Sequence, residues 1–356
     1  MSIHEKNDVV VIGGGAFGCT LASLLADAGS KVTVWVRQKK IADEINQKHT
    51  CLRYLGERGL SSHLRATLDL GYAVKSTKVI LVAIPAQSFR EVSRELGGFI
   101  EGDQVVVHAT KGIELKSFDR MSEILRQETC ARKIGVLSGP NLAKELVLGL
   151  PSGALIASRY PQVCRVMQDL FLKTPLRLYR GRDVIGTEVS GAFKNIIAFA
   201  VGLADGMGFK DNTKALLTTR GYAEMVAFGV SLGADKDTFA GLAGMGDLMA
   251  TCGSPLSRNR SAGKRVGMGE DWREVVASTG SVTEGIATTK AVHEKAKSLP
   301  LRLEITAAMH DFLYEGLSKK DLVERLMAVP VGVEMAKLQI PAAFAQDAPL
   351  VKGALL

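Results

Sequence analysis

The sequence predicts an α/β fold in which an N-terminal Rossmann-type, doubly wound sheet is followed by an all-α C-terminal domain. An apolar strand at residues 9–12 runs directly into a glycine turn of the form GxGxxG, and strands then alternate with helices to about residue 180. From residue 187 onward, strand-like runs disappear and apolar residues recur at the helical period. The 356 residues suffice for two domains, which usually contain roughly 100–200 residues each.

The first domain is expected to span residues 1–186. Its glycine turn opens a helix at about residues 16–28, which Gly29 and Ser30 end before a second strand at residues 31–36. A helix at residues 38–47 is followed by a loop rich in Arg, Gly and Ser. Further strands are expected at residues 79–84, 104–109, 134–137, 153–157 and 176–179, with helices at 89–96 and 118–126 and from about 141. Repeated strand–helix units predict a parallel sheet whose ligands gather at the carboxyl ends of the strands.

The second domain is expected to be all-helical and to span residues 187–334. Apolar residues at the helical period predict helices at residues 188–203, 212–232, 239–246, 272–277, 284–296, 305–314 and 320–327. The remaining residues, 335–356, are rich in Ala and Pro and show no clear period, so a loosely ordered tail is expected there.

The glycine turn predicts a nicotinamide dinucleotide site. Gly13, Gly15 and Gly18 suit a tight turn, close backbone approach to a pyrophosphate, and helix–strand packing. The amides at the start of the following helix are expected to face that pyrophosphate. The second strand ends on Arg37 and further cations, with no carboxylate to hold a ribose 2′-hydroxyl. This pattern favours NADPH over NADH, although Arg37 stacked on adenine is compatible with either.

Composition excludes several other classes of protein. The net charge of +8 is scattered, without a run of like charges, so no nucleic-acid binding is expected. Five widely spaced cysteines without a CxxC pair, and six histidines without a ligand pattern, predict reduced thiols and no metal. No uninterrupted apolar run reaches the ~18 residues of a membrane span, and the polar N-terminus leads at once into a strand. A cytoplasmic location without membrane insertion is therefore expected.

Two lysines are candidates for chemistry. Lys194 lies near the start of an otherwise almost wholly apolar helix, where loss of hydration lowers the pKa of an ammonium group. Lys111 follows the carboxyl end of a strand and precedes Gly112, so it is a second candidate cation for an anionic substrate. The structural alternatives are a Lys194 that extends its ammonium into water and a Lys111 in an ordinary surface loop.

Residues 241–260 predict a donor-rich loop with one carboxylate, Asp247. In the Ser257-Arg258-Asn259-Arg260 segment, Arg258 suits phosphate oxygens and its neighbours add neutral donors. A merely flexible glycine loop is the alternative. Glu284 is expected either to cap a helix or to reach a cofactor ribose, and Arg220 with Glu224 is expected to form a structural pair along one helix.

Seven segments in order resemble the bacterial NAD(P)-dependent glycerol-3-phosphate dehydrogenase family. They are the glycine turn, the segment around Lys111, Ser-Gly-Pro at 138–140, Ser-Gly-Ala-Phe-Lys-Asn at 190–195, Gly-Asp-Leu at 246–248, Ser-Arg-Asn-Arg at 257–260 and Thr-Glu-Gly at 283–285. The similarity covers about residues 7–334. It implies reversible reduction of dihydroxyacetone phosphate to sn-glycerol 3-phosphate, a phospholipid precursor, on a Rossmann domain joined to a helical domain.

The resemblance also implies roles for individual residues. Lys194 would be the catalytic acid/base, with Asp247 as its partner and Arg258 on the substrate phosphate. Bacterial members often have Ser or Thr where this chain has Asn141, so that contact is left open. The substrate-binding residues would be Lys111, Gly139, Asn141, Lys194, Asp247, Ser257, Arg258 and Asn259. The cofactor-binding residues would be Gly13, Gly15, Ala16, Phe17, Gly18, Arg37, Tyr54, Lys111, Ala143, Arg258, Val282 and Glu284.

Two other functions remain as alternatives at this stage. A β-hydroxyacid or ketopantoate-type dehydrogenase also joins a Rossmann domain to helices and uses a helix lysine, but its substrates are carboxylates, which the donor-rich segment at residues 257–260 disfavours. A non-catalytic NAD(H) sensor would explain the net charge, yet the sequence shows no helix-turn-helix with a basic recognition face. A homodimer through the helical faces is left open.

Overall fold

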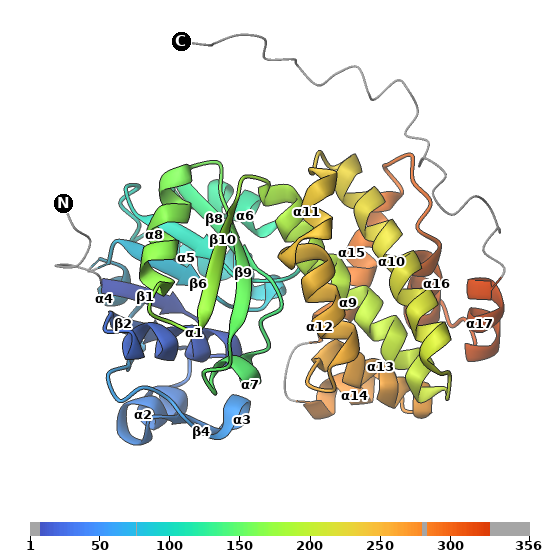
Figure 1. Cartoon of the computed structure of the whole chain (residues 1–356), viewed down its shortest axis with the longest axis horizontal. Coiled ribbons are helices and arrows are strands. Elements are labelled where there is room, and N and C mark those ends of the chain that lie inside the picture. The colour runs from blue at the N-terminus through green and yellow to red at the C-terminus, as the bar shows by residue number, and fades with distance from the viewer. Residues whose placement is uncertain (1–7, 76, 280–282, 328–356) are drawn as a thin grey trace, which may run out of the picture.

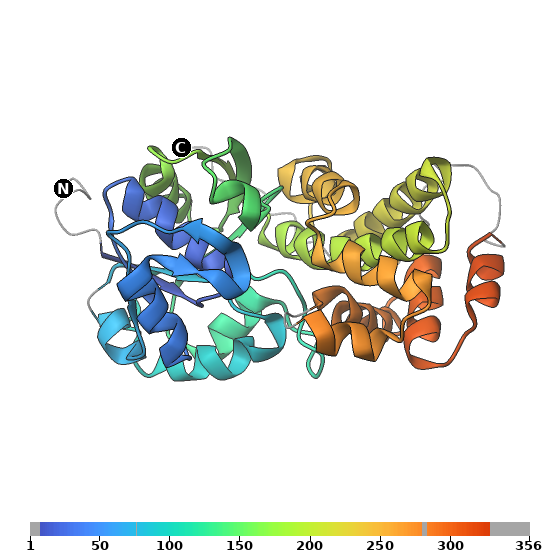
Figure 2. The same ribbon diagram turned by 90° about the horizontal axis from the view of Figure 1, so that it is seen from below.

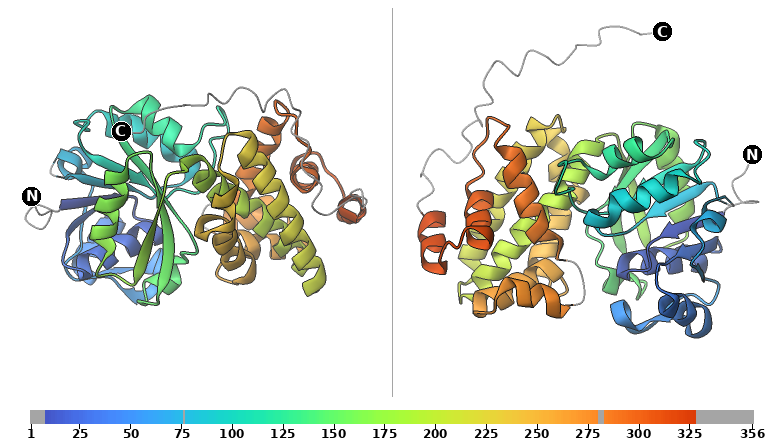
Figure 3. Two further views of the ribbon diagram at one scale, coloured as in Figure 1. Left: turned by 45° about the horizontal axis from the view of Figure 1, so that its top comes forward. Right: turned by 180° about the vertical axis from the view of Figure 1, so that it is seen from behind.

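The computed structural model describes residues 8–75, 77–279 and 283–327. They form a sheet lobe and a helical lobe that lie side by side (Figure 1) and remain so in the other views (Figure 3). The tail expected at residues 335–356 lies outside the described residues. The predicted fold class, a doubly wound α/β region followed by helices, is confirmed.

One eight-stranded sheet forms the sheet lobe, in the order β10-β9-β8-β7-β6-β1-β2-β5. The alternating side chains of β1 divide between its two faces, since Val9 and Val11 join one apolar cluster and Val10 and Ile12 the other. Helices therefore cover both faces (Figure 2). The strands are β1 Asp8–Ile12, β2 Lys31–Trp35, β5 Arg65–Thr67, β6 Val79–Val82, β7 Val105–His108, β8 Lys133–Ser138, β9 Ser152–Ala157 and β10 Leu176–Gly181; the main helices are α1 Ala16–Asp27, α2 Lys39–Lys48, α5 Phe89–Gly97, α6 Met121–Glu128 and α8 Pro161–Phe171.

The sheet is mixed rather than wholly parallel, which corrects the sequence prediction. Strand β9 pairs with β8 antiparallel, and β10 pairs with β9 parallel. The connection between β8 and β9 contains only the four-residue helix α7 (Ala143–Leu146). A helix of four residues cannot pack across the sheet as a crossover helix does, and the chain turns back beside β8.

Local structure differs from the prediction in three further places. The region expected as a loop after α2 contains the two-stranded sheet of β3 (Thr50–Cys51) and β4 (Gly56–Gly59), the short helices α3 (Leu52–Leu55) and α4 (Leu70–Lys75), and edge strand β5. Helix α6 begins at Met121 rather than at Phe118, because Phe118 has a left-handed φ of 62°. Helix α8, with Pro161 in its first turn, was not predicted.

The helical lobe is built around α9 (Val184–Gly206). Gly186, the domain boundary expected from the sequence, lies in the first turn of this helix. By length and composition α9 is the one helix of the described residues that would suffice to cross a membrane, but 94% of its apolar window is buried inside the protein. Around it lie α10 Asp211–Ser231, α11 Lys236–Ala240, α12 Asp247–Gly253, α13 Arg258–Met268, α14 Trp272–Thr279, α15 Glu284–Ala296, α16 Glu304–Tyr314 and α17 Lys319–Met327.

Glu188 joins α9 to the sheet lobe through a buried polar network. Its carboxylate accepts hydrogen bonds from the backbone N–H and the hydroxyl of Ser122, at 2.7 and 2.8 Å, and forms an ion pair with Arg120. The Nε2 atom of His108, at the end of β7, lies 3.0 Å away. Burial raises the pKa of Glu188, but His108, Arg120 and the Ser122 amide outweigh it and lower the pKa to about 2. Glu188 therefore stays ionised while it holds the two lobes together.

Glycines allow α13 to lie directly on α9. A Cβ at Gly202 or Gly206 would lie 2.0 Å from a carbonyl oxygen of α13, and a Cβ at Gly263 or Gly267 would lie 2.1 or 2.3 Å from a carbonyl oxygen of α9. Each helix presents two such glycines four positions apart, so they share one face of the helix. This backbone contact fixes the start of α13 relative to α9.

We expect Gly263→Ala to lower the free energy of unfolding by about 1–3 kcal/mol, because the added Cβ would clash with the carbonyl oxygen of Phe199. Gly253→Ala is the matched control: it also lies in a helix, and its Cβ would meet no atom within 4 Å. Chemical denaturation of both variants measures the difference. Equal stability would contradict the role given to the glycine contact.

Candidate active site

Asp247 binds two lysines at the junction of the lobes. Its Oδ1 lies 2.5 Å from Nζ of Lys194, and its Oδ2 lies 2.6 Å from Nζ of Lys111. Lys111 also donates a hydrogen bond of 3.0 Å to the carbonyl oxygen of Gly139. Lys194 and Asp247 are buried, whereas the Lys111 side chain is 18% exposed. The three groups together carry one net positive charge, which suits an anionic substrate.

Three different elements bring these groups together. Lys194 lies on α9, Lys111 follows β7, and Asp247 begins α12. Gly191 makes the meeting possible, because a Cβ there would lie 3.3 Å from Cγ of Lys111 and 3.1 Å from the hydroxyl of Ser138. The Ser-Gly-Ala-Phe-Lys segment thus supplies both the lysine and, one turn earlier, the space for its neighbour.

The surroundings of Lys194 lower its pKa to about 8. Burial is the largest cause, and the nearby charge of Lys111 acts in the same direction, whereas Asp247 opposes both. Lys194 also donates a 2.8 Å hydrogen bond to the hydroxyl of Thr251, which donates in turn to the backbone oxygen of Asp247. An ammonium with this pKa can give up and regain a proton near neutral pH.

Thr251 was missed by the sequence reasoning. It lies four residues after Asp247 on α12, so both side chains occupy one face of the helix. An Asp followed four positions later by a hydroxyl residue is the signal that would have found it. The predicted helix at residues 239–246 divides instead into α11 and a π-helical turn at Leu242–Gly246, which delivers Asp247 to the site. Such turns are frequent at functional sites.

The glycine turn has the geometry that a dinucleotide requires. Gly13 has φ +123°, and a Cβ there would lie 2.4 Å from the carbonyl oxygen of Ala83; a Cβ at Gly18 would lie 2.0 Å from the oxygen of Gly13. At Gly15 a Cβ would meet no atom within 4 Å, so the backbone borders open space. Ala16 and Phe17 begin α1, whose cap has no side-chain hydrogen bond. The first amides of α1 are thus free for an anion, and the residues fit a pyrophosphate.

Glu284 reaches the same edge of the sheet from the helical lobe. Its Oε1 accepts a 3.0 Å hydrogen bond from the backbone N–H of Ala86, and its buried Oε2 has no hydrogen-bond partner within the described part of the chain. Burial raises the pKa of Glu284, although the Ala86 amide and the charge of Arg258 oppose this. A buried oxygen without a partner fits a ligand hydroxyl or amide. Val282, expected beside it, lies outside the described residues.

The segment at residues 257–260 starts a helix rather than forming a loop. The Ser257 hydroxyl accepts a hydrogen bond from the backbone N–H of Arg260 and caps α13. Asn259 donates to Oδ1 of Asn195 at 2.9 Å, and its Oδ1 accepts from the N–H of Gly285 at 2.8 Å. Asn259 therefore contributes to the packing of α9, α13 and α15, and Ser257 to the start of α13. Arg258 is exposed at the start of α13, near Glu284, where its guanidinium is accessible to a ligand.

The remaining predicted residues lie around these groups. Arg37 is exposed just beyond β2, and Tyr54 is half-buried on α3. Ala143 begins α7 and accepts a 3.4 Å hydrogen bond from the Thr20 hydroxyl of α1. Asn141 donates to Ser152 Oγ and to the Gly153 carbonyl at 3.2 and 3.1 Å, and its buried Oδ1 has no partner in the described chain.

The expected Arg220–Glu224 pair is wrong: Glu224 accepts hydrogen bonds from the backbone N–H groups of Ile305 and Thr306, and so caps α16.

The structure also brings together His293, His310 and Asp311, whose potential metal-ligand atoms lie within 4.8 Å of one another. The two imidazole rings are stacked, with centroids 3.9 Å apart, and Arg325 pairs with Asp311.

The chain matches known proteins over nearly its whole described length. Residues 8–164 match the family model of the N-terminus of NAD-dependent glycerol-3-phosphate dehydrogenase, and residues 183–324 match that of its C-terminus. A glycerol-3-phosphate dehydrogenase [NAD(P)+] of Acinetobacter baylyi is 43% identical over 90% of this chain and 89% of its own length.

Solved structures agree with this. The crystal structure of a glycerol-3-phosphate dehydrogenase from Coxiella burnetii covers 91% of this chain and 99% of its own, with a TM-score of 0.87 and 32% identity. A ketopantoate reductase from Ralstonia eutropha covers 90% of this chain and 99% of its own, but with a TM-score of 0.57 and 12% identity it shares the fold alone. The chain therefore belongs to the NAD-dependent glycerol-3-phosphate dehydrogenase family.

Proposed function

We propose that this protein reversibly reduces dihydroxyacetone phosphate to sn-glycerol 3-phosphate with NAD(P)H. The buried Lys194, held by Asp247 beside Lys111, is the observation that carries the proposal. The site combines an ammonium group of lowered pKa with a net positive charge. It therefore suits the reduction of the carbonyl group of an anionic substrate. The glycerol phosphate formed would supply phospholipid synthesis.

In the proposed mechanism, a nicotinamide cofactor held at the glycine turn and the start of α1 would supply the hydride that C2 of the substrate takes up. Lys194, as ammonium, donates its proton to the C2 oxygen while negative charge develops there, and in the reverse direction the neutral amine removes that proton. Asp247 and Thr251 fix the direction of the Lys194 side chain through contacts of 2.5 and 2.8 Å. Lys111 attracts the substrate from its partly exposed position, and Arg258 binds the phosphate at the open edge.

The finer points of the proposal concern cofactor, location and assembly. The exposed Arg37 beyond β2 supports a preference for NADPH through the 2′-phosphate. A cytoplasmic location is supported by the burial of α9 and by five cysteines that form no disulfide. No metal is required by the proton transfer assigned to Lys194. A homodimer remains part of the proposal, and light scattering of the purified protein measures it.

Oxidation of NADPH, and separately of NADH, in the presence of dihydroxyacetone phosphate is the direct test. Rapid loss of absorbance with either cofactor supports the proposal. Ketopantoate and β-hydroxyacid substrates are measured in parallel, because turnover of those compounds without turnover of dihydroxyacetone phosphate would replace the proposal by the alternative weighed from the sequence. Cofactor binding with no turnover of any of these substrates would favour a sensor.

The pH dependence of reduction is expected to report on Lys194. Reduction requires the ammonium form, so kcat/KM should fall as the pH rises through about 8. Asp247→Asn removes the carboxylate that raises this pKa, so the fall should move to lower pH. Lys194→Ala should lower kcat by about 10²–10⁴ and abolish this limb of the profile. If kcat/KM of Asp247→Asn falls at the same pH as that of the wild type, the assignment of this fall to Lys194 is contradicted.

Arg37 is expected to set the cofactor preference. Arg37→Ala should raise KM for NADPH by about tenfold or more, the value of one charge-assisted contact, and leave KM for NADH nearly unchanged. Steady-state kinetics with both cofactors measure the ratio. Lys31→Ala, which changes a cation at the opposite end of β2, is the control. An equal rise in KM for both cofactors would contradict a contact between Arg37 and the 2′-phosphate.

Arg258 is expected to recognise the phosphate group of the substrate. Arg258→Ala should lower kcat/KM for dihydroxyacetone phosphate by about 10–100-fold, as for loss of a charge-assisted contact. The same change should leave the slower reaction of dihydroxyacetone, which lacks the phosphate, almost unaltered. Parallel measurements on the two substrates separate recognition from a general defect. A similar loss of kcat/KM with both substrates would contradict a contact between Arg258 and the phosphate group.

A further inference from the structure

The connection between β7 and α6, residues 109–120, carries Lys111 and lies between the two lobes. Its apolar side chains enter the core of the helical lobe, where Ile113 is buried and Leu115 and Phe118 are partly buried. Its acidic side chains, Glu114 and Asp119, instead meet the sheet lobe at α5. The connection is thus held from both sides, and its position determines where the backbone of Lys111 lies.

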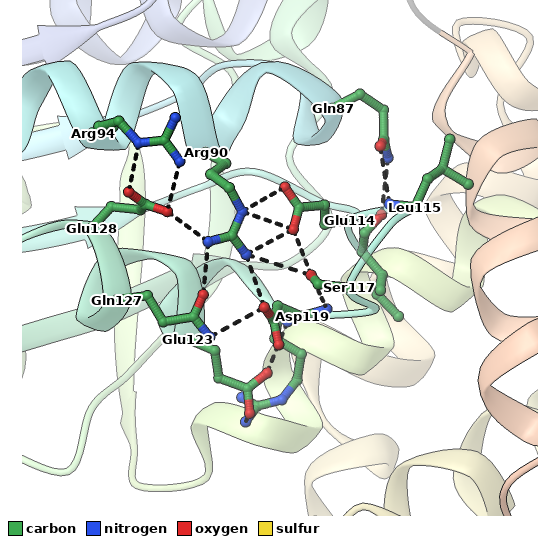
Figure 4. A network of polar contacts seen from close by, with 12 residues as sticks. Gln87, Arg90, Arg94, Glu114, Leu115, Ser117, Asp119, Glu123, Gln127 and Glu128 are labelled. Atoms are coloured by element: carbon green, nitrogen blue, oxygen red, sulfur yellow. Dashed lines mark hydrogen bonds and ion pairs between the residues drawn. The ribbon is translucent and has the colours of Figure 1, made fainter.

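Arg90 of α5 uses all three nitrogen atoms of its guanidinium to bind this connection and the helix α6 that follows it (Figure 4). The Nε atom donates to both oxygens of Glu114 at 2.9 Å, and Nη2 donates to Glu114 at 2.7 Å and to Asp119 at 2.8 Å. The Nη1 atom donates to Gln127 and Glu128 of α6, each at 2.7 Å. One planar group therefore joins the middle of the connection, its C-terminal end and the helix that follows it.

A second contact comes from the short 3₁₀ helix η2 (Ala86–Ser88), just before α5, and fixes the backbone of the same connection. Gln87, one turn before Arg90, donates to the carbonyl oxygen of Ile113 at 2.9 Å and accepts from the N–H of Leu115 at 3.1 Å (Figure 4). Next to Lys111, a Cβ at Gly112 would lie 2.5 Å from the Cβ of Ala86. The backbone beside Lys111 is therefore packed tightly against η2.

Electrostatics make Arg90 the centre of this network. Three carboxylates, those of Glu114, Asp119 and Glu128, lie within 2.9 Å of its nitrogen atoms. The Arg90 side chain is only 23% exposed. Its hydrogen bonds with Glu114 and Glu128 raise the pKa of Arg90, and the hydrogen bond that Glu114 accepts from Arg90 lowers the pKa of Glu114. Without the guanidinium, the like charges of Glu114, Asp119 and Glu128 would remain close together, and their repulsion would displace the connection from its present position beside α6.

We propose that Arg90 is a positioning residue for the reaction, which holds the β7–α6 connection so that Lys111 meets Asp247 and the substrate. Arg90 touches neither substrate nor cofactor in this proposal; it acts through the path of residues 112–119. The inference rests on the proposed function, because it takes the role of Lys111 in substrate binding from there.

A double-mutant cycle between Arg90 and Lys111 is the central test. Arg90→Gln should raise KM for dihydroxyacetone phosphate by about tenfold and change kcat much less, since it weakens substrate binding through Lys111. In a Lys111→Ala background, the same Arg90 change should add less than about twofold, because the group through which it acts is gone. Losses that multiply in the double variant, or an unchanged KM for Arg90→Gln, would overturn the proposal.

Arg94→Gln is the matched control. Arg94 lies one turn along the same helix and pairs with Glu128, but it does not reach residues 112–119 (Figure 4). Its side chain is 67% exposed, so its replacement should leave KM near the wild-type value. An equal rise in KM for the Arg94 and Arg90 variants would indicate a general effect of charge on α5 and would contradict the specific role of Arg90.

A second measurement does not depend on activity. Lys116 is exposed in the middle of the connection, so trypsin can cleave after it once the backbone loosens. Arg90→Gln should increase the rate of cleavage after Lys116 severalfold, and Arg94→Gln should not. Equal cleavage rates in the Arg90 variant and the wild type would overturn the proposal. Failure of the proposed function is distinguishable, because the wild-type protein would then not turn over dihydroxyacetone phosphate, whereas the cleavage measurement requires no turnover.

Discussion

A single carboxylate that balances two ammonium groups is the constraint on which the rest of the site depends. A buried lysine is costly unless it is paired, and Lys194 and Lys111 both take Asp247 as their partner. Their Nζ atoms can approach Asp247 together only if α9, the end of β7 and the start of α12 hold fixed positions. The glycine-mediated contact of α13 with α9, the space at Gly191 and the π-helical turn before Asp247 all serve that geometry.

The fold and the chemical groups of the site were largely predictable, because each has a local signal. A strand followed by GxGxxG predicts the dinucleotide turn, and a lysine in an apolar helix predicts a perturbed ammonium. The direction of β9 was not predictable from periodicity alone, since a strand has the same alternation in both directions; only the short connection before it decides the pairing. Ser257 was predicted as a ligand donor, which stays a prediction, but the sequence reasoning missed that its hydroxyl also accepts the hydrogen bond that caps α13.

Contacts between residues far apart in the sequence were missed for one physical reason. Spacing rules describe neighbours three or four positions apart, as for Asp247 and Thr251, but Arg90 meets Glu114 through the packing of α5 against the β7–α6 connection. The expected Arg220–Glu224 pair shows the opposite error. The spacing was correct, yet the free amides at the start of α16 compete for the Glu224 carboxylate and bind it instead.

The buried contact of Glu188 with Ser122, Arg120 and His108 has a consequence for the thermodynamics of substrate binding. Hinge opening at the start of α9 would separate an ionised carboxylate from its donors in a dry interior, so the unliganded lobes are expected to keep their relative orientation. Little conformational entropy then has to be lost on binding. The free energy of substrate contacts is thereby available to favour the transition state over the bound ground state rather than to assemble the site.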